Sequence, residues 1–297
     1  MPTPELVSGV DAHTKRLALH EAVETRLGTL APGVFDGISA SMTQRAGFQV
    51  AYMSGAAVAA SSSGLPDVGL ATQTEFVSAV RMLANLLDIP LVADADTGFG
   101  DVTHVFRTVR EYEAGGAAAI QFEDQQFPKK CGHLQGKTLI GAQEFASKIE
   151  VATQARRDPA TMIVARTDSC SVYGFSDAID RANLYVEAGA DMVFVEAPES
   201  MGDLSSIPNR VKVPAVLNLV ANGRSPKVPL SAVSDLGFGL AILPGINLAA
   251  AMMAMRSTLD EVRSATFDLD LQPSPADLFQ EFDLAFWETL RARFETV

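Results

Sequence analysis

Residues 112–124, YEAGGAAAIQFED, decide the fold. A helical stretch ends at Gly115-Gly116, as a glycine C-cap predicts, and the apolar run 118–122 that follows is a short strand ending in Glu123-Asp124. Two later segments, YVEAGADMVFVEA at 185–197 and SDLGFGLAILP at 234–244, repeat the order of helix, glycine and apolar strand. The repetition predicts that the chain is built from βα units.

About eight such strands follow one another, each a short continuous apolar run of the kind that a parallel sheet covered by helices needs. A chain of 297 residues that is 47% hydrophobic has the usual size of a single (β/α)8 barrel. An open, doubly wound sheet is the main rival fold. Because no G-x-G-x-x-G motif follows an early strand, the sequence favours an α/β barrel of the TIM type.

The predicted single domain has three parts. Residues 1–28 hold a helical pattern, from 11 to 27, that suits a helix packed outside the main fold; residues 30–262 form the barrel; residues 263–297 are a helical C-terminal extension. The Met/Ala-rich stretch 247–262 and the aromatic-rich stretch 276–294 are expected either to lie over the barrel or to pack on another subunit.

The composition excludes several kinds of partner. A formal net charge of −13 and a pI near 4.7 argue against nucleic acid or an anionic membrane surface, because phosphates are bound mainly by Lys and Arg. Cys131 and Cys170 are the two cysteines, so we expect no disulfide framework and a reducing, cytoplasmic compartment. The N-terminal segment lacks the apolar core of a signal peptide, and no uninterrupted apolar run reaches the roughly 18 residues of a transmembrane helix.

Residues 127–137, FPKKCGHLQGK, combine a thiol, an imidazole, lysines and two glycines directly after the strand at 118–122. This composition is typical of a catalytic loop, whose glycines allow it to open and close. Lys129, Lys130 and His133 are expected to lower the pKa of the Cys131 thiol. The alternative is a solvated basic turn with an incidental cysteine.

Polar residues stand at the ends of the predicted strands. The carboxyl ends of barrel strands meet on one face, so we expect these side chains to converge there: Ser54, Asp67, Asp94, Asp96, Glu123, Arg166, Glu196 and Asn218. Strand alternation puts Asp94 and Asp96 on the same side. Gathered carboxylates repel one another unless a cation lies between them, and oxygen ligands favour Mg²⁺ or Mn²⁺. The alternative is a set of separate surface carboxylates at loop starts.

Arg166 follows a four-residue apolar run and provides a fixed guanidinium that can bind a carboxylate in bidentate fashion. The strand that ends in Ser54-Gly55, followed by a small-residue loop at 56–67, leaves backbone N–H groups that can cradle an anion. A metal, an arginine and these amides together suit a small 2-oxo or 2-hydroxy acid with at least one further carboxylate.

Four segments carry a resemblance to a known family: SGAAVAASSSGLPDVGLAT at 54–72, DADTGFG at 94–100, QFEDQQFPKKCGHLQGK at 121–137 and IVARTD at 163–168. They resemble the signature segments of the isocitrate lyase and phosphoenolpyruvate mutase superfamily, in the same order, over roughly residues 34–246. The KKCGH loop is similar to that of its carbon–carbon lyases, which act on isocitrate, 2-methylisocitrate and alkylmalates. The resemblance implies a barrel in a homotetramer, with the last helix swapped between subunits and Mg²⁺ at the site.

Carried over residue by residue, the resemblance implies that Asp94 contacts the metal directly, with Asp67, Asp96 and Glu123 holding it through water. It implies a substrate pocket formed by Tyr52, Ser54, Gly55, Ala56, Asp94, Gly132, His133, Arg166, Glu196 and Asn218, with Ser225 as a further contact. The catalytic candidates are Cys131, His133, Glu123 and Arg166.

The implied reaction breaks the bond beside a 2-hydroxy carbon of a di- or tricarboxylate. It leaves a 2-oxo acid and a carbanion that the second carboxylate stabilises as an enolate, and the metal stabilises the oxyanion charge. The carbanion needs a proton, for which Cys131 is the candidate acid. That role requires a neutral thiol, which conflicts with the cations around it. The general base is not identified.

Three positions depart from the family pattern. Leu134 stands where methylisocitrate lyases have an arginine that can meet a third carboxylate, which favours smaller or more apolar substrates. In NLVANGRSP at 218–226, Ala221 replaces a usual glutamate and Ser225 a usual threonine. A serine there is similar to fungal oxaloacetate hydrolases, so hydrolysis of oxaloacetate to oxalate and acetate is one alternative. Rearrangement of a phosphonate bond is another, and a non-catalytic binding role is a third.

Overall fold

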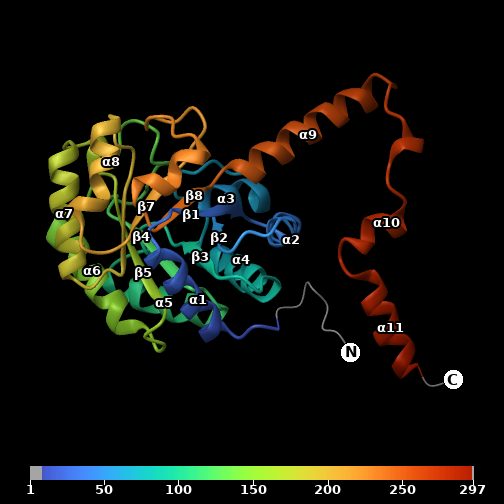
Figure 1. The fold of residues 1–297 in the computed structure, drawn as a ribbon, viewed down its shortest axis with the longest axis horizontal. Helices are drawn as coiled ribbons and strands as arrows, with labels where there is room; N and C mark the ends of the chain where they lie inside the picture. The colour runs from blue at the N-terminus through green and yellow to red at the C-terminus, as the bar shows by residue number, and fades with distance from the viewer. Residues whose placement is uncertain (1–8, 296–297) are drawn as a thin grey trace.

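The structure is a computed structural model, and it describes residues 9–295. Eight parallel strands form a closed barrel in sequence order, with β8 paired to β1 (Figure 1). The prediction of a TIM-type barrel is confirmed, and the doubly wound alternative is wrong. The strands are β1 (Thr29–Val34), β2 (Ala51–Met53), β3 (Leu91–Asp94), β4 (Ala119–Glu123), β5 (Met162–Thr167), β6 (Met192–Val195), β7 (Ala215–Asn218) and β8 (Leu240–Leu243).

Helices between the strands cover the outside of the barrel, and their apolar faces bury residues against it (Figure 1). Asp36 and Thr72 begin two of them with reciprocal capping boxes. The α-helices up to β8 are α1 (Ala12–Glu24), α2 (Gly37–Arg45), α3 (Gly55–Ser63), α4 (Gln73–Leu86), α5 (Val102–Gly115), α6 (Ala142–Ala155), α7 (Phe175–Glu187) and α8 (Met201–Arg210). Short 3-10 turns η1 (Ser169–Ser171) and η2 (Leu230–Leu236) precede α7 and β8.

Alternation along the strands explains how the sequence aims polar groups at one end of the barrel interior. In β4, Ala119 belongs to the interior cluster while Ile120 and Phe122 pack against helices, so Glu123 at the strand end also faces inward. The same alternation leads inward from Val164 to Arg166 in β5. The carboxyl ends of the strands therefore turn their polar residues toward a common axis.

The segment after Ser54 differs from the prediction of a small-residue loop at 56–67. Residues Gly55–Ser63 form helix α3, and the Ser54 hydroxyl accepts a hydrogen bond from the Ala57 N–H as its N-cap. Alanine and serine leave no apolar stripe that periodicity could detect, whereas Gly64, in the left-handed conformation, ends the helix. The loop is thus confined to residues 64–72.

Helix α1 closes the amino end of the barrel and does not simply pack outside it. Leu19 and Val23 are fully buried in the interior cluster. Lys15 Nζ donates to the carbonyls of Ala84 and Leu87 at the end of α4, and Arg16 Nη2 donates to the Glu113 carbonyl in α5. These cations satisfy carbonyls that a helix C-terminus would otherwise leave free.

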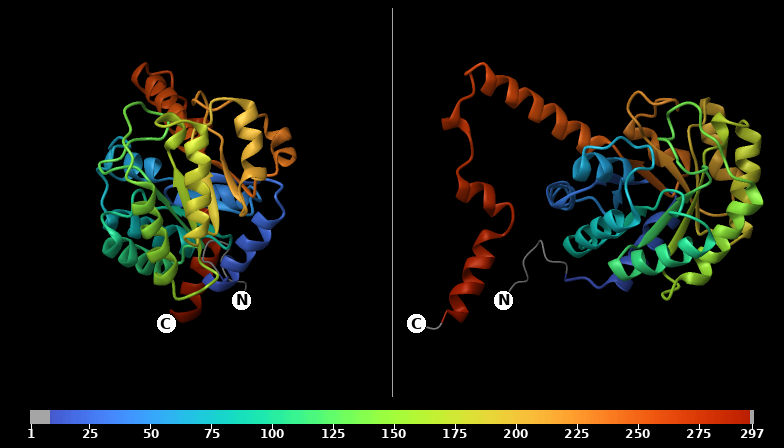
Figure 2. Two further views of the ribbon diagram at one scale, coloured as in Figure 1. Left: turned by 90° about the vertical axis from the view of Figure 1, so that its left-hand side faces the viewer. Right: turned by 180° about the vertical axis from the view of Figure 1, so that it is seen from behind.

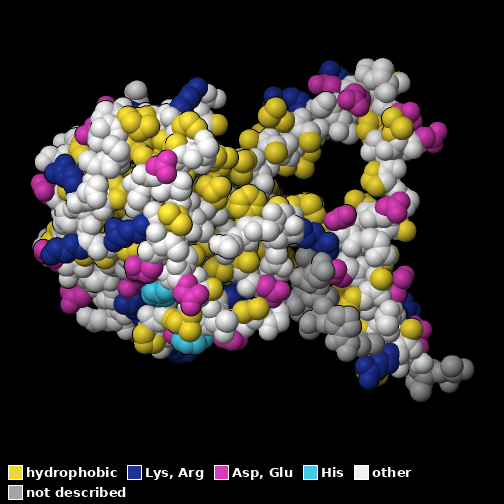
Figure 3. Space-filling view, in the orientation of Figure 1, with side chains coloured by type: hydrophobic (Ala, Val, Ile, Leu, Met, Phe, Trp, Pro, Cys, Tyr) yellow, Lys and Arg dark blue, Asp and Glu magenta, His cyan; other side chains and the backbone are white. Residues whose placement is uncertain are grey.

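After β8 the chain leaves the barrel as an extended arm that projects away from it (Figures 1 and 2), and an ion pair of 3.3 Å joins Arg45 of α2 to Asp283 in the arm. The arm holds α9 (Ile246–Arg263), η3 (Leu269–Leu271), α10 (Pro275–Gln280) and α11 (Leu284–Phe294), and no side chain of these described helices is buried. Hydrophobic side chains lie along the arm in Figure 3. Met253 and Leu259 are among its exposed residues. These helices were expected either to lie over the barrel or to pack on another subunit. In the structure they do not lie over their own barrel, and packing on another subunit stays a prediction.

None of the helices in the described part of the chain has both the length and the apolar character needed to cross a bilayer.

Candidate active site

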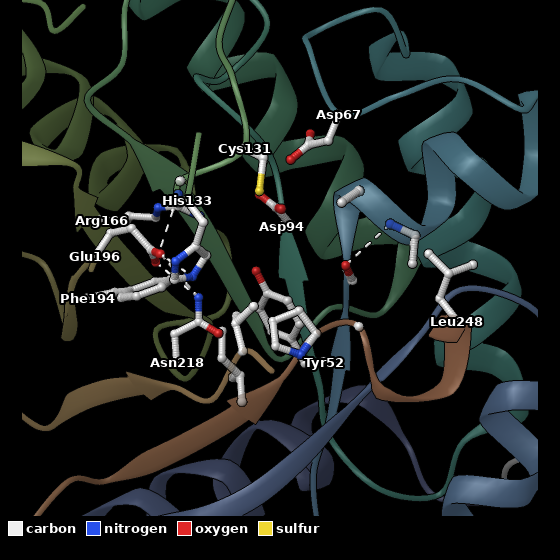
Figure 4. Close-up of a pocket in the computed structure, with 18 of the residues that line it drawn as sticks. Tyr52, Asp67, Asp94, Cys131, His133, Arg166, Phe194, Glu196, Asn218 and Leu248 are labelled. Atoms are coloured by element: carbon white, nitrogen blue, oxygen red, sulfur yellow. Dashed lines mark hydrogen bonds and ion pairs between the residues drawn. The ribbon is translucent and has the colours of Figure 1, made fainter. Parts of the chain in front are cut away.

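A cavity of about 170 Å³ opens at the carboxyl end of the barrel strands (Figure 4). Its size suits a small organic acid and is well below the range of about 300–1,000 Å³ for pockets of drug-sized ligands. Most of the predicted site residues line it together: Tyr52, Ser54, Ala56, Asp67, Asp94, Cys131, Gly132, His133, Arg166, Glu196 and Asn218. Residues far apart in the sequence therefore converge as expected.

Four predicted residues do not line this cavity. Gly55, Asp96 and Glu123 lie behind its wall: the Gly55 N–H donates to Asp94 Oδ2 at 3.3 Å, and the Asp96 N–H donates to Asp94 Oδ1 at 3.0 Å. Ser225 lines a neighbouring hollow with Asn218 and Ala221. The cradle predicted at Ser54-Gly55 thus orients a carboxylate of the protein, Asp94, through the Gly55 amide.

The first turn of α3 still offers one donor to a ligand. The Ser54 side chain accepts from Ala57, and the Gly55 N–H is taken by Asp94. The N–H of Ala56, a residue that lines the cavity, has no hydrogen-bond partner within residues 9–295. A helix N-terminus with a free amide favours an anion.

Lys129 lies among the carboxylates, which the sequence analysis did not foresee. Its ammonium pairs with Asp67 and lies 2.8 Å from Asp96 Oδ1, with only 3% of its side chain exposed. Burial alone would lower the pKa of Lys129, but the surrounding Asp96, Glu123, Asp67 and Asp94 raise it well above its usual range. The positive charge that the gathered carboxylates require is therefore supplied in part by Lys129 of the loop at 127–137.

Glu123 remains uncompensated. It is buried, neither carboxylate oxygen receives a hydrogen bond, and its nearest ion-pair contact is Arg166 Nη1 at 3.5 Å. Burial raises the pKa of Glu123 well above its usual value, against the opposing effect of Arg166 and Lys129. Such an orphaned carboxylate fits a site for a hydrated cation.

The acids do not form a compact ligand cage. Among residues 9–295, no three Asp, Glu, His or Cys side chains are grouped closely enough to hold a metal ion directly. A divalent cation at this site would have to take most of its ligands from water and substrate. That is the usual habit of Mg²⁺, which keeps several waters.

Residues 127–137 are docked on the barrel. The Cys131 N–H donates to the Asp67 carbonyl at 3.1 Å, and Gln125 exchanges two hydrogen bonds with the backbone of Lys130. A Cβ at Gly132 would lie 2.3 Å from Arg166 Nη2, so only glycine allows the loop this close. Figure 4 shows the Cys131 sulfur pointing into the cavity toward Asp94. This docking argues against the alternative of a solvated basic turn.

The expected effect of the loop cations on Cys131 is wrong in sign. Lys129 turns to the carboxylates, and Lys130 Nζ donates to the Gly136 carbonyl at 3.0 Å. Burial, together with Asp67 and Glu196, raises the pKa of the Cys131 thiol, while the His133 N–H and Arg166 oppose this. The thiol is therefore held neutral, as a proton donor must be.

Arg166 is held by Asp168, a residue that the sequence analysis quoted but did not assign. Nε donates to Asp168 Oδ2 at 2.9 Å and Nη2 to Oδ1 at 3.1 Å, so Asp168 already makes a bidentate pair with the guanidinium. The guanidinium also stacks 5.0 Å from the centre of the Phe194 ring. Only part of Arg166 is left to meet a substrate carboxylate.

His133 meets Glu196 on the same side of the cavity (Figure 4). Its Nδ1 accepts the Arg224 N–H at 3.0 Å, so the ring proton sits on Nε2, which faces Glu196 Oε1 across 2.9 Å. Asn218 Nδ2 donates to Glu196 Oε2 at 3.1 Å. Burial raises the pKa of Glu196, but Arg166 and His133 outweigh it and lower that pKa below its usual value.

The remaining wall of the cavity is apolar and was missed from the sequence. It is formed by residues at and beyond the ends of β6, β7 and β8: Phe194, Val220, Ile242, Pro244 and Leu248. Leu134 is not part of the lining, and no described Arg or Lys other than Lys129 and Arg166 lines the cavity. The arrangement can hold a small dianion at one side and a hydrocarbon substituent at the other.

Comparisons with known proteins agree with this geometry. Residues 17–263 match the family described as phosphoenolpyruvate phosphomutase. The chain is 43% identical over 246 residues to a 2-methylisocitrate lyase of Aeropyrum pernix, covering 83% of this chain and 79% of that protein. It is 40% identical over 237 residues to a 2,3-dimethylmalate lyase of Eubacterium barkeri, covering 80% of this chain and 82% of that protein.

A crystal structure of 2,3-dimethylmalate lyase, described as a PEP mutase/isocitrate lyase superfamily member, superposes with a TM-score of 0.90 at 33% identity, covering 96% of each chain. The predicted resemblance is confirmed, and the named lyases among the relatives support the prediction of a carbon–carbon lyase. The chain belongs to the phosphoenolpyruvate phosphomutase family, within the PEP mutase/isocitrate lyase superfamily.

Proposed function

We propose that this protein cleaves the C2–C3 bond of a 2-hydroxy dicarboxylate that carries alkyl substituents, of the alkylmalate type, to give a 2-oxo acid and a simple carboxylate. One observation carries the proposal: a cavity too small for a large ligand combines the half-buried Cys131 thiol with anion-binding groups and an apolar wall. The thiol suits proton delivery to carbon, and the wall suits an alkyl group.

Different residues of the site would bind the substrate and donate the proton. The Ala56 N–H and the outer edge of Arg166 bind and orient substrate carboxylates. As the C2–C3 bond breaks, its electron pair moves to C3 and is delocalised into the adjacent carboxylate, while the C2 hydroxyl transfers its proton to a general base and becomes a carbonyl. Cys131 then donates its proton to C3 and completes the carboxylate product. The docked loop excludes water from the carbanion.

We propose Mg²⁺, with Mn²⁺ as a substitute, as the cofactor. Asp94 would contact it, and Asp67, Asp96 and Glu123 would hold its water ligands; the orphaned Glu123 carboxylate supports this assignment. The cation supplies stabilisation of the oxyanion charge that develops at the C2 oxygen. Dialysis against EDTA should abolish turnover, and Mg²⁺ should restore it. Full turnover in EDTA would exclude a metal cofactor.

The apolar wall distinguishes an alkylmalate from a tricarboxylate. A third carboxylate would face Val220, Ile242 and Leu248 without a cation to pair with, which is costly in a buried site. A methyl group there would instead remove apolar surface from water, worth about 0.8 kcal/mol per carbon. We therefore place 2,3-dimethylmalate ahead of 2-methylisocitrate and isocitrate as substrate.

A substrate panel tests the proposal directly. We expect the highest kcat/KM with 2,3-dimethylmalate and release of pyruvate and propionate, measured by coupled assay and NMR. Cys131→Ser should keep its fold and lose turnover by more than about a hundredfold. A faster reaction with 2-methylisocitrate would overturn the alkylmalate assignment, and unchanged turnover of Cys131→Ser would remove the thiol from the mechanism.

The same panel includes the two rival reactions. Hydrolysis of oxaloacetate was suggested by Ser225, but this residue lies outside the cavity lining, so no contact in the site favours it. Release of oxalate from oxaloacetate would nevertheless identify a hydrolase. A new ³¹P resonance with phosphonopyruvate would identify a phosphonate rearrangement.

We also propose that the protein is a homotetramer in a reducing, cytoplasmic compartment. The unburied α9 with exposed Met252, Met253 and Leu259 supports assembly, because large apolar patches on a monomer usually mark an interface. Light scattering should give about four times the chain mass of 31.5 kDa. Met253→Glu combined with Leu259→Glu should dissociate the assembly, and a wild-type monomer would refute it.

A further inference from the structure

Asp168 lies between the docked loop and Arg166, and it contacts both. The carboxylate is completely buried, and its Oδ1 accepts from Arg166 Nη2 at 3.1 Å and from Lys137 Nζ at 2.7 Å. Lys137 ends the loop, and its ammonium also donates to the carbonyl of Gly132, next to Cys131. One carboxylate oxygen is therefore shared between the docked loop and the guanidinium of the site.

Asp168 itself is fixed from behind by a second buried carboxylate. Its backbone N–H donates to Asp124 Oδ1 at 3.0 Å, and Asp124 Oδ2 accepts from Thr167 Oγ1 at 2.7 Å and from Tyr185 at 2.8 Å. A group anchored in this way does not follow the loop when it moves. If residues 127–137 undocked, Asp168 would stay in place and Lys137 would leave it, which would change the charge around Arg166.

His133 repeats this arrangement at the other side of the guanidinium. Glu196 Oε1 lies 2.9 Å from His133 Nε2, and Glu196 Oε2 lies 3.9 Å from Arg166 Nη2. Without the loop, Arg166 would face Asp168, Glu196 and Glu123, three carboxylates around one cation. A guanidinium so outnumbered has little attraction left for a substrate anion.

We propose that Asp168 is a positioning residue through which closure of the loop makes Arg166 competent to bind an anion. With Lys137 in place, the ammonium takes up part of the Asp168 charge, and Arg166 keeps its orientation while gaining affinity for a substrate carboxylate. By linkage, a bound anion favours the closed loop to the same extent. The inference rests on the proposed role of Arg166 in binding a substrate carboxylate.

Lys137→Met tests the coupling without removing any group that touches the substrate. In the variant, hydrogen exchange of the loop amides, including those of Cys131 and Leu134, should accelerate at least tenfold without ligand. Binding of oxalate, a small dianion used with Mg²⁺ in a calorimeter, should weaken at least tenfold, and KM should rise more than kcat falls. Asp168→Asn removes the charge that Lys137 neutralises, so in the Asp168→Asn background the further change Lys137→Met should no longer weaken oxalate binding.

Two further variants distinguish the specific coupling through Lys137 from a general effect of removing positive charge from the loop. Lys130→Met removes a charge from the same loop, where the side chain contacts only the Gly136 carbonyl among the described residues, and should change each value less than twofold. Lys137→Arg keeps the cation and should recover most of the oxalate affinity. An equal loss in Lys130→Met and Lys137→Met would overturn the coupling, as would a Lys137→Met loop that opens while oxalate affinity stays unchanged.

The outcomes distinguish this inference from the proposed function. Loss of oxalate affinity in Lys137→Met together with no turnover of any alkylmalate would sustain the coupling and reject the substrate assignment. Turnover of 2,3-dimethylmalate by the wild type, with oxalate affinity unchanged in Lys137→Met, would sustain the substrate assignment and reject the coupling.

Discussion

The two ends of the barrel treat buried charge in opposite ways. At the amino end, the Glu113 carboxylate accepts the N–H groups of Arg157 and Asp158 and the Thr161 hydroxyl, at 2.8 to 3.0 Å. At the carboxyl end, Glu123 is also buried and receives no hydrogen bond. Two glutamates of one protein, in similar burial, thus have opposite surroundings.

This difference in hydrogen bonding indicates that Glu113 has a structural role and Glu123 a functional one. A fully satisfied buried network rigidifies a fold, whereas a buried carboxylate without donors raises its energy and is tolerated only where it serves a purpose. Apart from Ser41, the buried side-chain atoms in residues 9–295 that neither a hydrogen bond nor a close ion pair satisfies belong to Gln121, Glu123 and Asn218 at the carboxyl end, whereas Asp96 and His133 there form ion pairs with Lys129 and Glu196. Mutations at the two ends should therefore affect different measurements.

The largest effect is expected at the point where the loop meets the site. Gly132→Ala places a methyl group against Arg166 and Glu196, so the loop cannot dock. We expect kcat/KM to fall at least about a hundredfold, as a displacement of about 1 Å can cause, with the melting temperature unchanged. Wild-type kcat/KM in this variant would mean that the docked loop is not the active state.

The next prediction concerns the unsatisfied glutamate. Glu123→Gln removes a buried charge that no hydrogen bond stabilises, so the free energy of unfolding should stay the same or rise by up to about 1 kcal/mol. Turnover should fall at least about tenfold, because the amide is a poorer partner for cation-bound water. Clear destabilisation by this change would show that the two ends do not differ as described.

The satisfied glutamate should respond in the opposite sense. Glu113→Gln turns an amide donor toward backbone N–H groups, which should cost about 2 kcal/mol of unfolding free energy and lower the melting temperature by about 5 °C. Turnover per folded molecule should not change. A variant that melts like the wild type, or loses kcat while folded, would contradict the structural role of the amino end.

The smallest effect is a pH dependence at the amino end. Burial raises the pKa of Asp158, but hydrogen bonds from His13, the Ala160 N–H and Arg16 outweigh it and lower that pKa to about 2. A lowered carboxyl pKa stabilises the fold above the unfolded value near 3.9, and this stabilisation disappears as the pH falls through 2.

Asp158→Asn should therefore be less stable than wild type between pH 5 and 7 in urea unfolding, and the difference should shrink below pH 4. A difference that is constant down to pH 3 would rule out the ionised Asp158 as its source. Glu111→Gln, in a surface ion pair with Arg81, provides the control and should show little change.

The sequence was sufficient for the barrel because its signals are local. Each strand is an apolar run ending in a polar residue, and alternation from Val164 to Arg166 or from Ala119 to Glu123 aims that residue inward. Helix α3 was missed because Ala and Ser give no amphipathic pattern. The apolar wall was missed because Val220 lies beyond its strand in an irregular segment, and because Leu248 lies at the start of α9, a stretch expected to lie over the barrel or to pack on another subunit.

Partners across space were the hardest part to predict. Lys129 and Lys130 adjoin Cys131 in sequence, yet their ammonium groups turn to Asp67, Asp96 and Gly136 and leave the thiol to the effect of burial. Asp168 follows Arg166 by two residues, and the segment IVARTD at 163–168 gave it no role of its own. Its role depends on Lys137, which only the folded loop brings to it.

The position of Lys129 has a consequence for how the protein folds before a metal ion binds. Since an ammonium already neutralises part of the charge of Asp67 and Asp96, the apoprotein can reach and keep its native shape without waiting for a divalent ion. Folding and activation are then separate events, unlike in small domains that collapse only around their ion. A chelator should therefore abolish the activity of this protein under conditions that leave its fold intact.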